Sequence, residues 1–294
     1  MSTWQDEVRG ALDGLAYGAR SALSPSVLQG AAVEIGWLTT HLAMYPLGLV
    51  RGAPDLPARL NLAGLGPAQR GLLVSDVRAA GTPILLAHGI IDNHTIFALM
   101  RRQLIRRGFS RIHTFSYSPL TLDVRRTAER MGREIEAICE ASGSDQIHVV
   151  GHSLGGLIAR YYVQRLGGDL RVRTLVTLGT PHAGTSVVPL ANAHPIVRQM
   201  RPGSAVLEEL TRPAPGCRTH FVSFWSDLDH LMDPLETARI DHPDLLVQNI
   251  QVTGIGHLAL PVHPAVATGI RQALDTARTE GADAAAQADG LTVA

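Results

Sequence analysis

The hexapeptide Gly151-His152-Ser153-Leu154-Gly155-Gly156 is the stretch of this chain that best indicates its fold. It comes after a short apolar run, Ile147-His148-Val149-Val150, and leads into the segment Leu157 to Val163, which reads as a helix. A strand, a sharp G-x-S-x-G turn and a helix form a nucleophile elbow, which projects a serine oxygen out of the sheet. Glycines flank the serine because the turn strains the backbone and the helix packs closely on neighbouring strands. The stretch predicts Ser153 as a nucleophile.

Around this elbow, strand-like and helix-like segments alternate between residues 81 and 278. The expected strands are Pro83–His88, Arg111–Tyr117, Ile147–Val150, Val172–Leu178, His220–Trp225 and Leu246–Val252. The expected helices, besides the one after Ser153, are Phe97–Arg107, Thr121–Ala141 and Pro264–Ala277. Such alternation implies parallel pairing with right-handed crossovers. The predicted fold class is α/β, a mostly parallel sheet with helices on both faces.

Composition narrows the class of protein. The 294 residues and a hydrophobic fraction of 45% suffice for one large domain and an appended segment. The formal net charge is zero, which removes the electrostatic reason to expect a nucleic-acid partner. Cys139 and Cys217 form no C-x-x-C pair and no disulfide framework, and Cys139 is expected in a helix core.

Residues 1–80 differ in pattern from the rest of the chain and predict an N-terminal helical extension. Trp4 to Leu23 has the spacing of an amphipathic helix. Residues 31–50 are mostly apolar and about long enough to span a bilayer, but Glu34 and Pro46 interrupt them. We expect a buried or surface-docked helix first, and a peripheral helix at a lipid interface second. A true span is the least favoured interpretation.

The two ends of the chain carry further expectations. The first ten residues contain two acidic side chains and lack a basic region followed by an apolar core, which argues against a secretory signal. We therefore expect a cytoplasmic protein, with membrane association as an option. Residues 279–294 are rich in Ala, Gly and Asp and are expected to be a disordered tail.

Residues 184–217 interrupt the sheet pattern. They contain five prolines with apolar residues between them: Pro189, Pro195, Pro202, Pro213 and Pro215. A cap or lid would lie here, over the carboxyl ends of the strands, to exclude water and bind an acyl chain. The alternative is a crossover loop with one short helix.

A nucleophilic serine needs two donors aimed at the developing oxyanion. One is the backbone N–H of the next residue, Leu154, and the other comes from the loop after an earlier strand. His88-Gly89-Ile90 ends such a strand, and Gly89 allows a tight turn that points the N–H of Ile90 into the site. The simpler interpretation is that His88-Gly89 only ends a strand.

The base should lie in a loop after the last strand, since the chain order in this arrangement is serine, acid, histidine. His257, in Thr253-Gly254-Ile255-Gly256-His257, comes after the last expected strand and is the best candidate. His263 directly precedes Pro264 and resembles the start of a helix. His242 lies upstream of the strand and is expected at the surface.

The acid should come after the strand His220–Trp225, where three aspartates compete. Asp229 fits best, because an acid in the turn just past the strand can reach the histidine. It would hold the tautomer of His257 and stabilise the imidazolium. Asp227 is the candidate for a turn residue, and Asp233, before Pro234, for a helix cap.

Four blocks of the chain resemble the α/β-hydrolase lipases and esterases, in particular small bacterial triacylglycerol lipases. The blocks are His88-Gly89-Ile90 with Asp92-Asn93, Gly151 to Gly156, Gly179-Thr180-Pro181-His182-Ala183-Gly184-Thr185, and Ser226-Asp227-Leu228-Asp229 with Gly254-Ile255-Gly256-His257. The resemblance covers about residues 80–277 and not the N-terminal 80. It implies Ser153 as nucleophile, Asp229 as acid, His257 as base, and Ile90 and Leu154 as oxyanion donors.

The expected function is hydrolysis of carboxylic esters of lipids or other small apolar molecules through an acyl-enzyme. An acyltransferase or a thioesterase would use the same residues, and a non-catalytic binding protein of the same fold is the remaining alternative. No metal or organic cofactor is expected, since no pair of ligands stands at H-E-x-x-H spacing. His182 could be a ligand or second base, but we expect it to pack behind the site.

Overall fold

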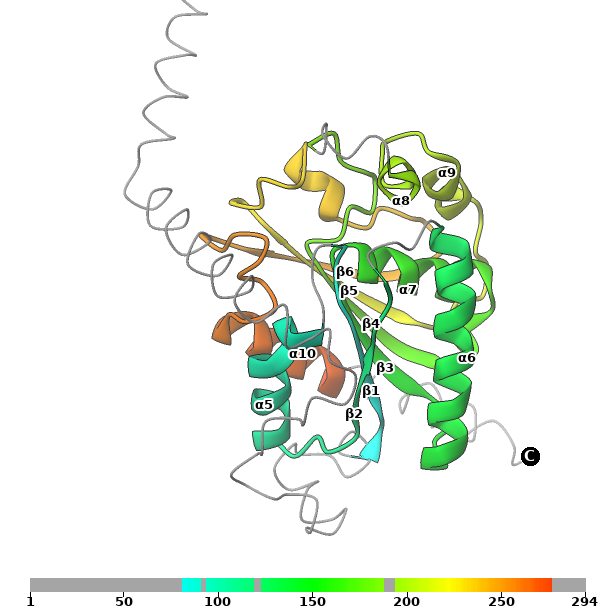
Figure 1. Cartoon of the computed structure of the whole chain (residues 1–294), viewed down its shortest axis with the longest axis vertical. Helices are drawn as coiled ribbons and strands as arrows, with labels where there is room; N and C mark the ends of the chain where they lie inside the picture. Colours follow the sequence, from blue (N-terminus) through cyan, green and yellow to red (C-terminus); the bar gives the residue numbers. More distant parts are fainter. Residues whose placement is uncertain (1–80, 91–93, 119–122, 188–193, 277–294) are drawn as a thin grey trace, which may run out of the picture.

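The computed structural model describes residues 81–90, 94–118, 123–187 and 194–276 (Figure 1). The expectations for the N-terminal extension, for Asp92-Asn93 and for the tail at 279–294 lie outside these ranges. Among the helices in the described ranges, none has the length and apolar character needed to span a membrane.

A six-stranded sheet runs through the described chain in the order β2-β1-β3-β4-β5-β6, with every neighbouring pair parallel. The strands are β1 (Ile84–Ala87), β2 (Ile112–Phe115), β3 (Ile147–His152), β4 (Val172–Leu178), β5 (His220–Ser226) and β6 (Leu246–Val252). The bounds of β4 and β6 are those predicted. β3 continues two residues further than predicted, because Gly151 and His152 still pair with β4.

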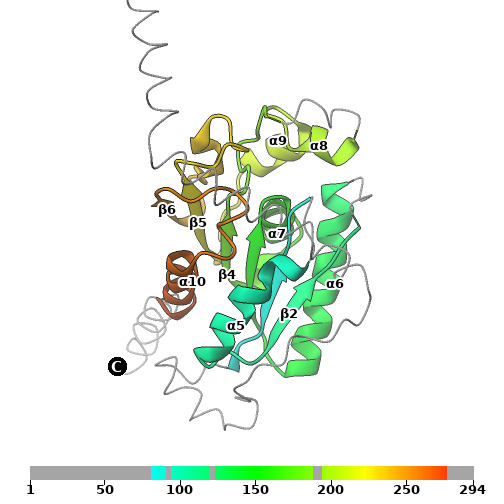
Figure 2. The same ribbon diagram turned by 60° about the vertical axis from the view of Figure 1, so that its left-hand side comes forward.

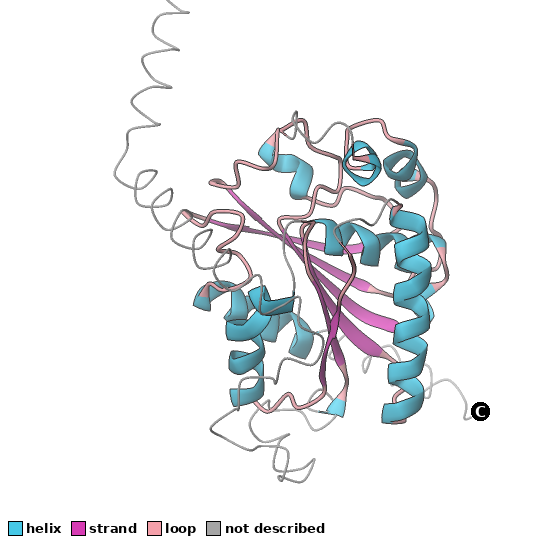
Figure 3. Ribbon diagram, in the orientation of Figure 1, coloured by secondary structure: helices cyan, strands magenta, loops and turns pink. Residues whose placement is uncertain are grey.

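Helices cover both faces of this sheet, which confirms the predicted α/β class (Figures 1 and 3). They are α5 (Ala98–Arg106), α6 (Val124–Ser142), α7 (Leu154–Arg165), α8 (Pro195–Gln199), α9 (Ala205–Thr211) and α10 (Pro264–Thr276). The described ranges also contain three short 3-10 helices: η2 (His94–Phe97), η3 (Gly168–Leu170) and η4 (Leu235–Ala238). Helices α5 and α10 lie on one face, and α6 and α7 lie on the other (Figure 2).

The side chains of β3 divide between two apolar cores. Val149 packs in the cluster of α6 and α7, whereas Val150 packs in the cluster of α5 and α10. Successive residues of a strand point to opposite faces, so a strand covered on both sides is a continuous apolar run. This burial on both faces holds β3 firmly where it enters the turn at Ser153.

Helix α6 illustrates how local signals set the element bounds. The Asp123 side chain caps its start by accepting from the Arg126 N–H at 3.1 Å, and Gly143 ends it in the left-handed conformation. The predicted apolar face of Val124, Met131, Ile135 and Ile138 is buried, as is Cys139. The helix begins at Val124 rather than at the predicted Thr121, because the cap at Asp123 fixes its first turn.

The described part of the insertion after β4 contains two short helices, α8 and α9, rather than the single helix of the loop alternative. Both lie above α6 and α7 in Figures 1 and 2, at the end of the sheet where β3 meets α7. Apolar side chains from α8 and α9 join the core of α6 and α7: Ile196, Val197, Val206, Leu207 and Leu210. The described part of the insertion is therefore packed on the domain.

Candidate active site

Ser153 occupies the turn between β3 and α7. Its backbone has φ 52° and ψ −124°, and among the described residues it is the one non-glycine residue with positive φ. An L-residue adopts this conformation only when its surroundings enforce it, and such strain is concentrated at functional sites. The Ser153 N–H donates to the Leu178 carbonyl at 2.9 Å, which ties the turn to β4. This is the geometry of a nucleophile elbow.

The glycines around Ser153 are required by close backbone approach. A Cβ on Gly155 would lie 2.5 Å from the His88 carbonyl oxygen and would overlap that of Ala87. A Cβ on Gly156 would overlap the Thr180 hydroxyl. Helix α7 can therefore begin against β1 and β4 only because these positions lack side chains.

His257 and Asp229 meet in the interior, although 28 residues separate them in the chain. The Nδ1 atom of His257 lies 2.9 Å from Oδ1 and 2.8 Å from Oδ2 of Asp229. The Asp229 side chain is fully buried, and Oδ1 also accepts from the Leu231 N–H at 3.1 Å. A carboxylate on Nδ1 places the imidazole proton there, so that Nε2 is the basic nitrogen.

Gly179, at the end of β4, lets these two side chains meet. Its φ is 51°, and a Cβ there would lie 2.6 Å from Oδ2 of Asp229 and 3.0 Å from Nδ1 of His257. The next residue, Thr180, donates its hydroxyl to the Ser153 carbonyl at 3.0 Å. Gly179 belongs to a block that carries the family resemblance, but sequence reasoning missed its part in the site.

The rival aspartates have other surroundings. Asp227 accepts from the Gly254 N–H at 2.7 Å through Oδ1, and so holds the loop that carries His257. Asp233 is exposed, and the 3-10 helix after it begins without a side-chain cap. Among the three candidates, the structure brings only Asp229 to His257.

The two alternative candidates for the base, His263 and His242, have hydrogen-bond partners outside the proposed site. His263 accepts from the Ala265 N–H at 3.3 Å at the start of α10, in keeping with its predicted position before that helix. The prediction that His242 lies at the surface is wrong, since His242 is buried. Its Nε2 donates to the Arg212 carbonyl at 3.0 Å, a partner 30 residues away that local sequence does not reveal.

The predicted oxyanion loop comes after β1, which pairs directly with β3 at Ala87 and Gly151. The His88 ring stacks on Tyr117 with 4.4 Å between centroids, and its Nε2 accepts from the Tyr117 N–H at 3.4 Å. The Nδ1–H then donates to the Gly89 carbonyl at 2.8 Å. This clamp by Tyr117, which sequence reasoning missed, holds the backbone just before Ile90.

His182 is buried behind the elbow. Its Nε2–H donates to the Thr177 hydroxyl at 2.9 Å, and that hydroxyl donates in turn to Ser223. Burial, assisted by the nearby Arg160, lowers the pKa of His182 well below its ordinary value. A buried neutral imidazole with these partners fits the expected packing role better than a second base.

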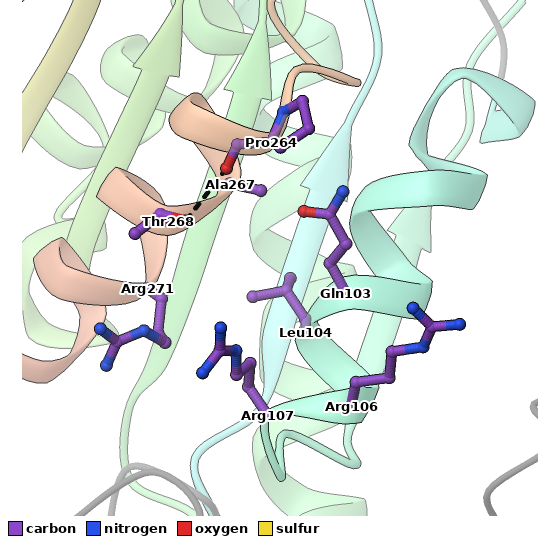
Figure 4. Close-up of a pocket in the computed structure, with 8 residues that line it drawn as sticks. All are labelled: Gln103, Leu104, Arg106, Arg107, Pro264, Ala267, Thr268 and Arg271. Atoms are coloured by element: carbon purple, nitrogen blue, oxygen red, sulfur yellow. Dashed lines mark hydrogen bonds between the residues drawn. The ribbon is translucent and has the colours of Figure 1, made fainter.

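The described residues contain no group of three His, Cys, Asp or Glu side chains arranged to hold a metal ion. A separate groove of about 300 Å³ lies between α5 and α10 (Figure 4). It is lined by Gln103, Leu104, Arg106, Arg107, Pro264, Ala267, Thr268 and Arg271, and therefore by neither Ser153, Asp229 nor His257.

Comparison with solved structures shows a shared fold. The mature form of a Bacillus licheniformis lipase superposes with a TM-score of 0.57 at 15% identity, covering 66% of this chain and 92% of the lipase. Lipase B of Aspergillus fumigatus superposes with a TM-score of 0.59 at 16% identity, covering 75% of this chain and 55% of that one. The fold is thus the α/β-hydrolase fold of these lipases.

The sequence matches cover a smaller part of this chain than the structural matches do. A triacylglycerol lipase of Vibrio cholerae is 27% identical over 133 residues, which are 44% of this chain and 39% of the lipase. This chain thus matches well under two thirds of that relative. The model of the palmitoyl protein thioesterase family matches residues 83–235, a segment that includes the Ser153 elbow, Gly179 and Asp229. Since this match extends over more than half of the chain, the protein belongs to the palmitoyl protein thioesterase family.

Proposed function

We propose that the protein is a serine hydrolase of carboxylic esters with Ser153 as nucleophile, His257 as base and Asp229 as acid. The observation that carries the proposal is the paired contact, at 2.9 and 2.8 Å, between His257 Nδ1 and the buried Asp229 carboxylate. This contact commits Nδ1 to the acid and leaves proton transfer to Nε2. The strained backbone of Ser153 supports its part in the same site.

The proposed reaction has two halves. His257 Nε2 takes the Ser153 hydroxyl proton while the oxygen attacks the substrate carbonyl, and then delivers that proton to the departing alcohol or thiol. Water then attacks the acyl carbon while His257 Nε2 takes its proton, and His257 returns that proton to the Ser153 oxygen as the acyl–serine bond breaks and the carboxylic acid product leaves. The N–H groups of Ile90 and Leu154 are proposed to donate to the oxyanion of both tetrahedral intermediates.

The proposed substrates are esters of lipids or other apolar small molecules, in line with the likeness to lipases. Thioesters are the second candidate, favoured by the family model, which covers both the elbow and Asp229. Esters and thioesters would form the same acyl-enzyme at Ser153 and differ only in the leaving group, an alcohol or a thiol. Transfer of the acyl group to an acceptor other than water would need the same residues.

The test compares leaving groups on matched acyl chains. Wild type and Ser153→Ala are assayed with p-nitrophenyl butyrate, p-nitrophenyl palmitate, palmitoyl-CoA and an S-palmitoyl peptide, with product analysis in added alcohol. We expect Ser153→Ala to lose on the order of 10⁴-fold in kcat. Equal activity of the two proteins would refute the proposal, and the ratio of thioester to ester turnover decides between the substrate classes.

A further inference from the structure

His152, the residue before Ser153, is the last residue of β3 and is completely buried. Two positions earlier on the strand, Val150 belongs to the core of α5 and α10, and alternate residues of a strand share a face. Ile255 and Leu258, from the loop that carries His257, pack in the same core. His152 therefore lies on the side of the sheet where that loop arrives.

His152 contacts the proposed base twice. Its Nε2–H donates to the backbone carbonyl of His257 at 3.1 Å. The two imidazole rings pack with 4.7 Å between centroids at an interplanar angle of 45°. Both contacts are made to His257 itself rather than to its neighbours.

Other anchors of the loop come from the end of β5. Asp229 holds the His257 ring, Asp227 accepts from the Gly254 N–H, and Ser226 donates to the Ile255 carbonyl. The contact from His152 differs because it comes from β3, the strand whose next residue is Ser153. It therefore links the position of the base directly to the position of the nucleophile.

We propose that His152 is a positioning residue that holds the His257 backbone and ring in register with Ser153. The inference rests on the proposed function, since it assumes that His257 is the base. The Nε2–H of His152 fixes the position of the His257 carbonyl, and the His152 ring limits rotation of the His257 imidazole. The Nε2 atom of His257 therefore stays aligned with Ser153 while its Nδ1 atom stays on Asp229.

The experiment separates the donor from the ring. His152→Phe keeps an aromatic ring but no donor, and His152→Gln keeps an amide N–H donor without a ring. With p-nitrophenyl butyrate, we expect His152→Phe to lose on the order of 10²-fold in kcat with little change in KM, because small misplacement of a catalytic group is costly. His152→Gln, which restores the donor but lacks the ring, should have a kcat between those of His152→Phe and wild type.

A matched control and a spectroscopic signal keep the inference distinct from folding and from the proposed function. His148→Gln replaces another buried histidine of β3, near the opposite end of the strand, and should change the thermal midpoint without the kcat loss. The low-field proton resonance of the His257–Asp229 hydrogen bond, assigned through its absence in Asp229→Asn, should shift in His152→Phe and return in His152→Gln.

The possible results distinguish the role of His152 from the proposed function. An active wild type with an unchanged kcat and resonance in His152→Phe would overturn the role of His152 and leave the proposed function standing. A wild type no more active than Ser153→Ala would overturn the proposed function, and the resonance would still decide whether His152 positions His257. A kcat loss in His148→Gln as large as in His152→Phe would also overturn the inference.

Discussion

Gly179 packs directly against the Asp229 carboxylate: a methyl group on Gly179 would lie 2.6 Å from Oδ2. We predict that Gly179→Ala displaces Asp229 from His257 and lowers kcat by on the order of 10²-fold. Steady-state kinetics checks this. Gly167→Ala is the control, since Gly167 also has positive φ, 72°, but nothing within 4 Å of its Cβ position. It should cost about 1 kcal/mol in stability and leave kcat intact.

The three aspartates after β5 should rank in a definite order. Asp229→Asn should lower kcat by on the order of 10⁴-fold, because an amide on Nδ1 favours the wrong tautomer of His257. Asp227→Asn keeps an oxygen for the Gly254 N–H and should have a small effect, and the exposed Asp233→Asn should have none. Measured kcat values for the three variants test the order, and a larger loss in Asp227→Asn would move the acid to that residue.

Glu209 connects the insertion after β4 to helices α6 and α7 and should make the stability of the protein depend on pH. It accepts from Arg125 at 2.6 Å through Oε1 and from the Tyr161 hydroxyl at 2.5 Å through Oε2. The hydrogen bond from Arg125 is the main reason that the pKa of Glu209 lies below its ordinary value of 4.5. A lowered carboxyl pKa stabilises the fold above the unfolded value, and this contribution is lost as the pH falls through the folded value.

Thermal midpoints of wild type and Glu209→Gln between pH 7 and pH 3 measure this contribution. The variant should melt lower at neutral pH, and the gap should close in acid. Glu208→Gln, on the same helix, is the control and should show no such gap. A gap for Glu209→Gln that is constant across the range would mean that the charge of Glu209 contributes nothing to stability, because the loss would then be independent of its protonation.

Burial of His182 should make the fold less stable in mild acid. Burial holds its pKa well below the ordinary 6.5, so the unfolded chain binds a proton below about pH 6.5 that the folded protein does not. Wild type should therefore lose stability as the pH falls through this range, and His182→Gln should lose less. The difference in unfolding free energy between pH 7.5 and pH 5.5 is the measurement. His230→Gln, at an exposed histidine, should retain the wild-type dependence.

Local sequence predicted the elements well wherever the pattern was uninterrupted. The strands Val172–Leu178 and Leu246–Val252 have their predicted bounds, because apolar and β-branched runs bounded by turn residues specify strands locally. The ends of α6 and β3 were displaced, since a cap at Asp123 and pairing of His152 with β4 set them. His242 was misplaced because its burial depends on the distant Arg212 carbonyl.

The alternation of strands and helices and the elbow at Ser153 could both be predicted from the sequence, since they depend on residues adjacent in the chain. The sequence favoured Asp229 over Asp227 from its place just past the strand, and the fold brings Asp229 to His257 while Asp227 accepts from the Gly254 N–H. Only the tertiary structure placed Gly179 beneath the pair of Asp229 and His257, and His152 against the base. These contacts could not be predicted because sheet order and burial select hydrogen-bonding partners from different strands, and no local pattern encodes either.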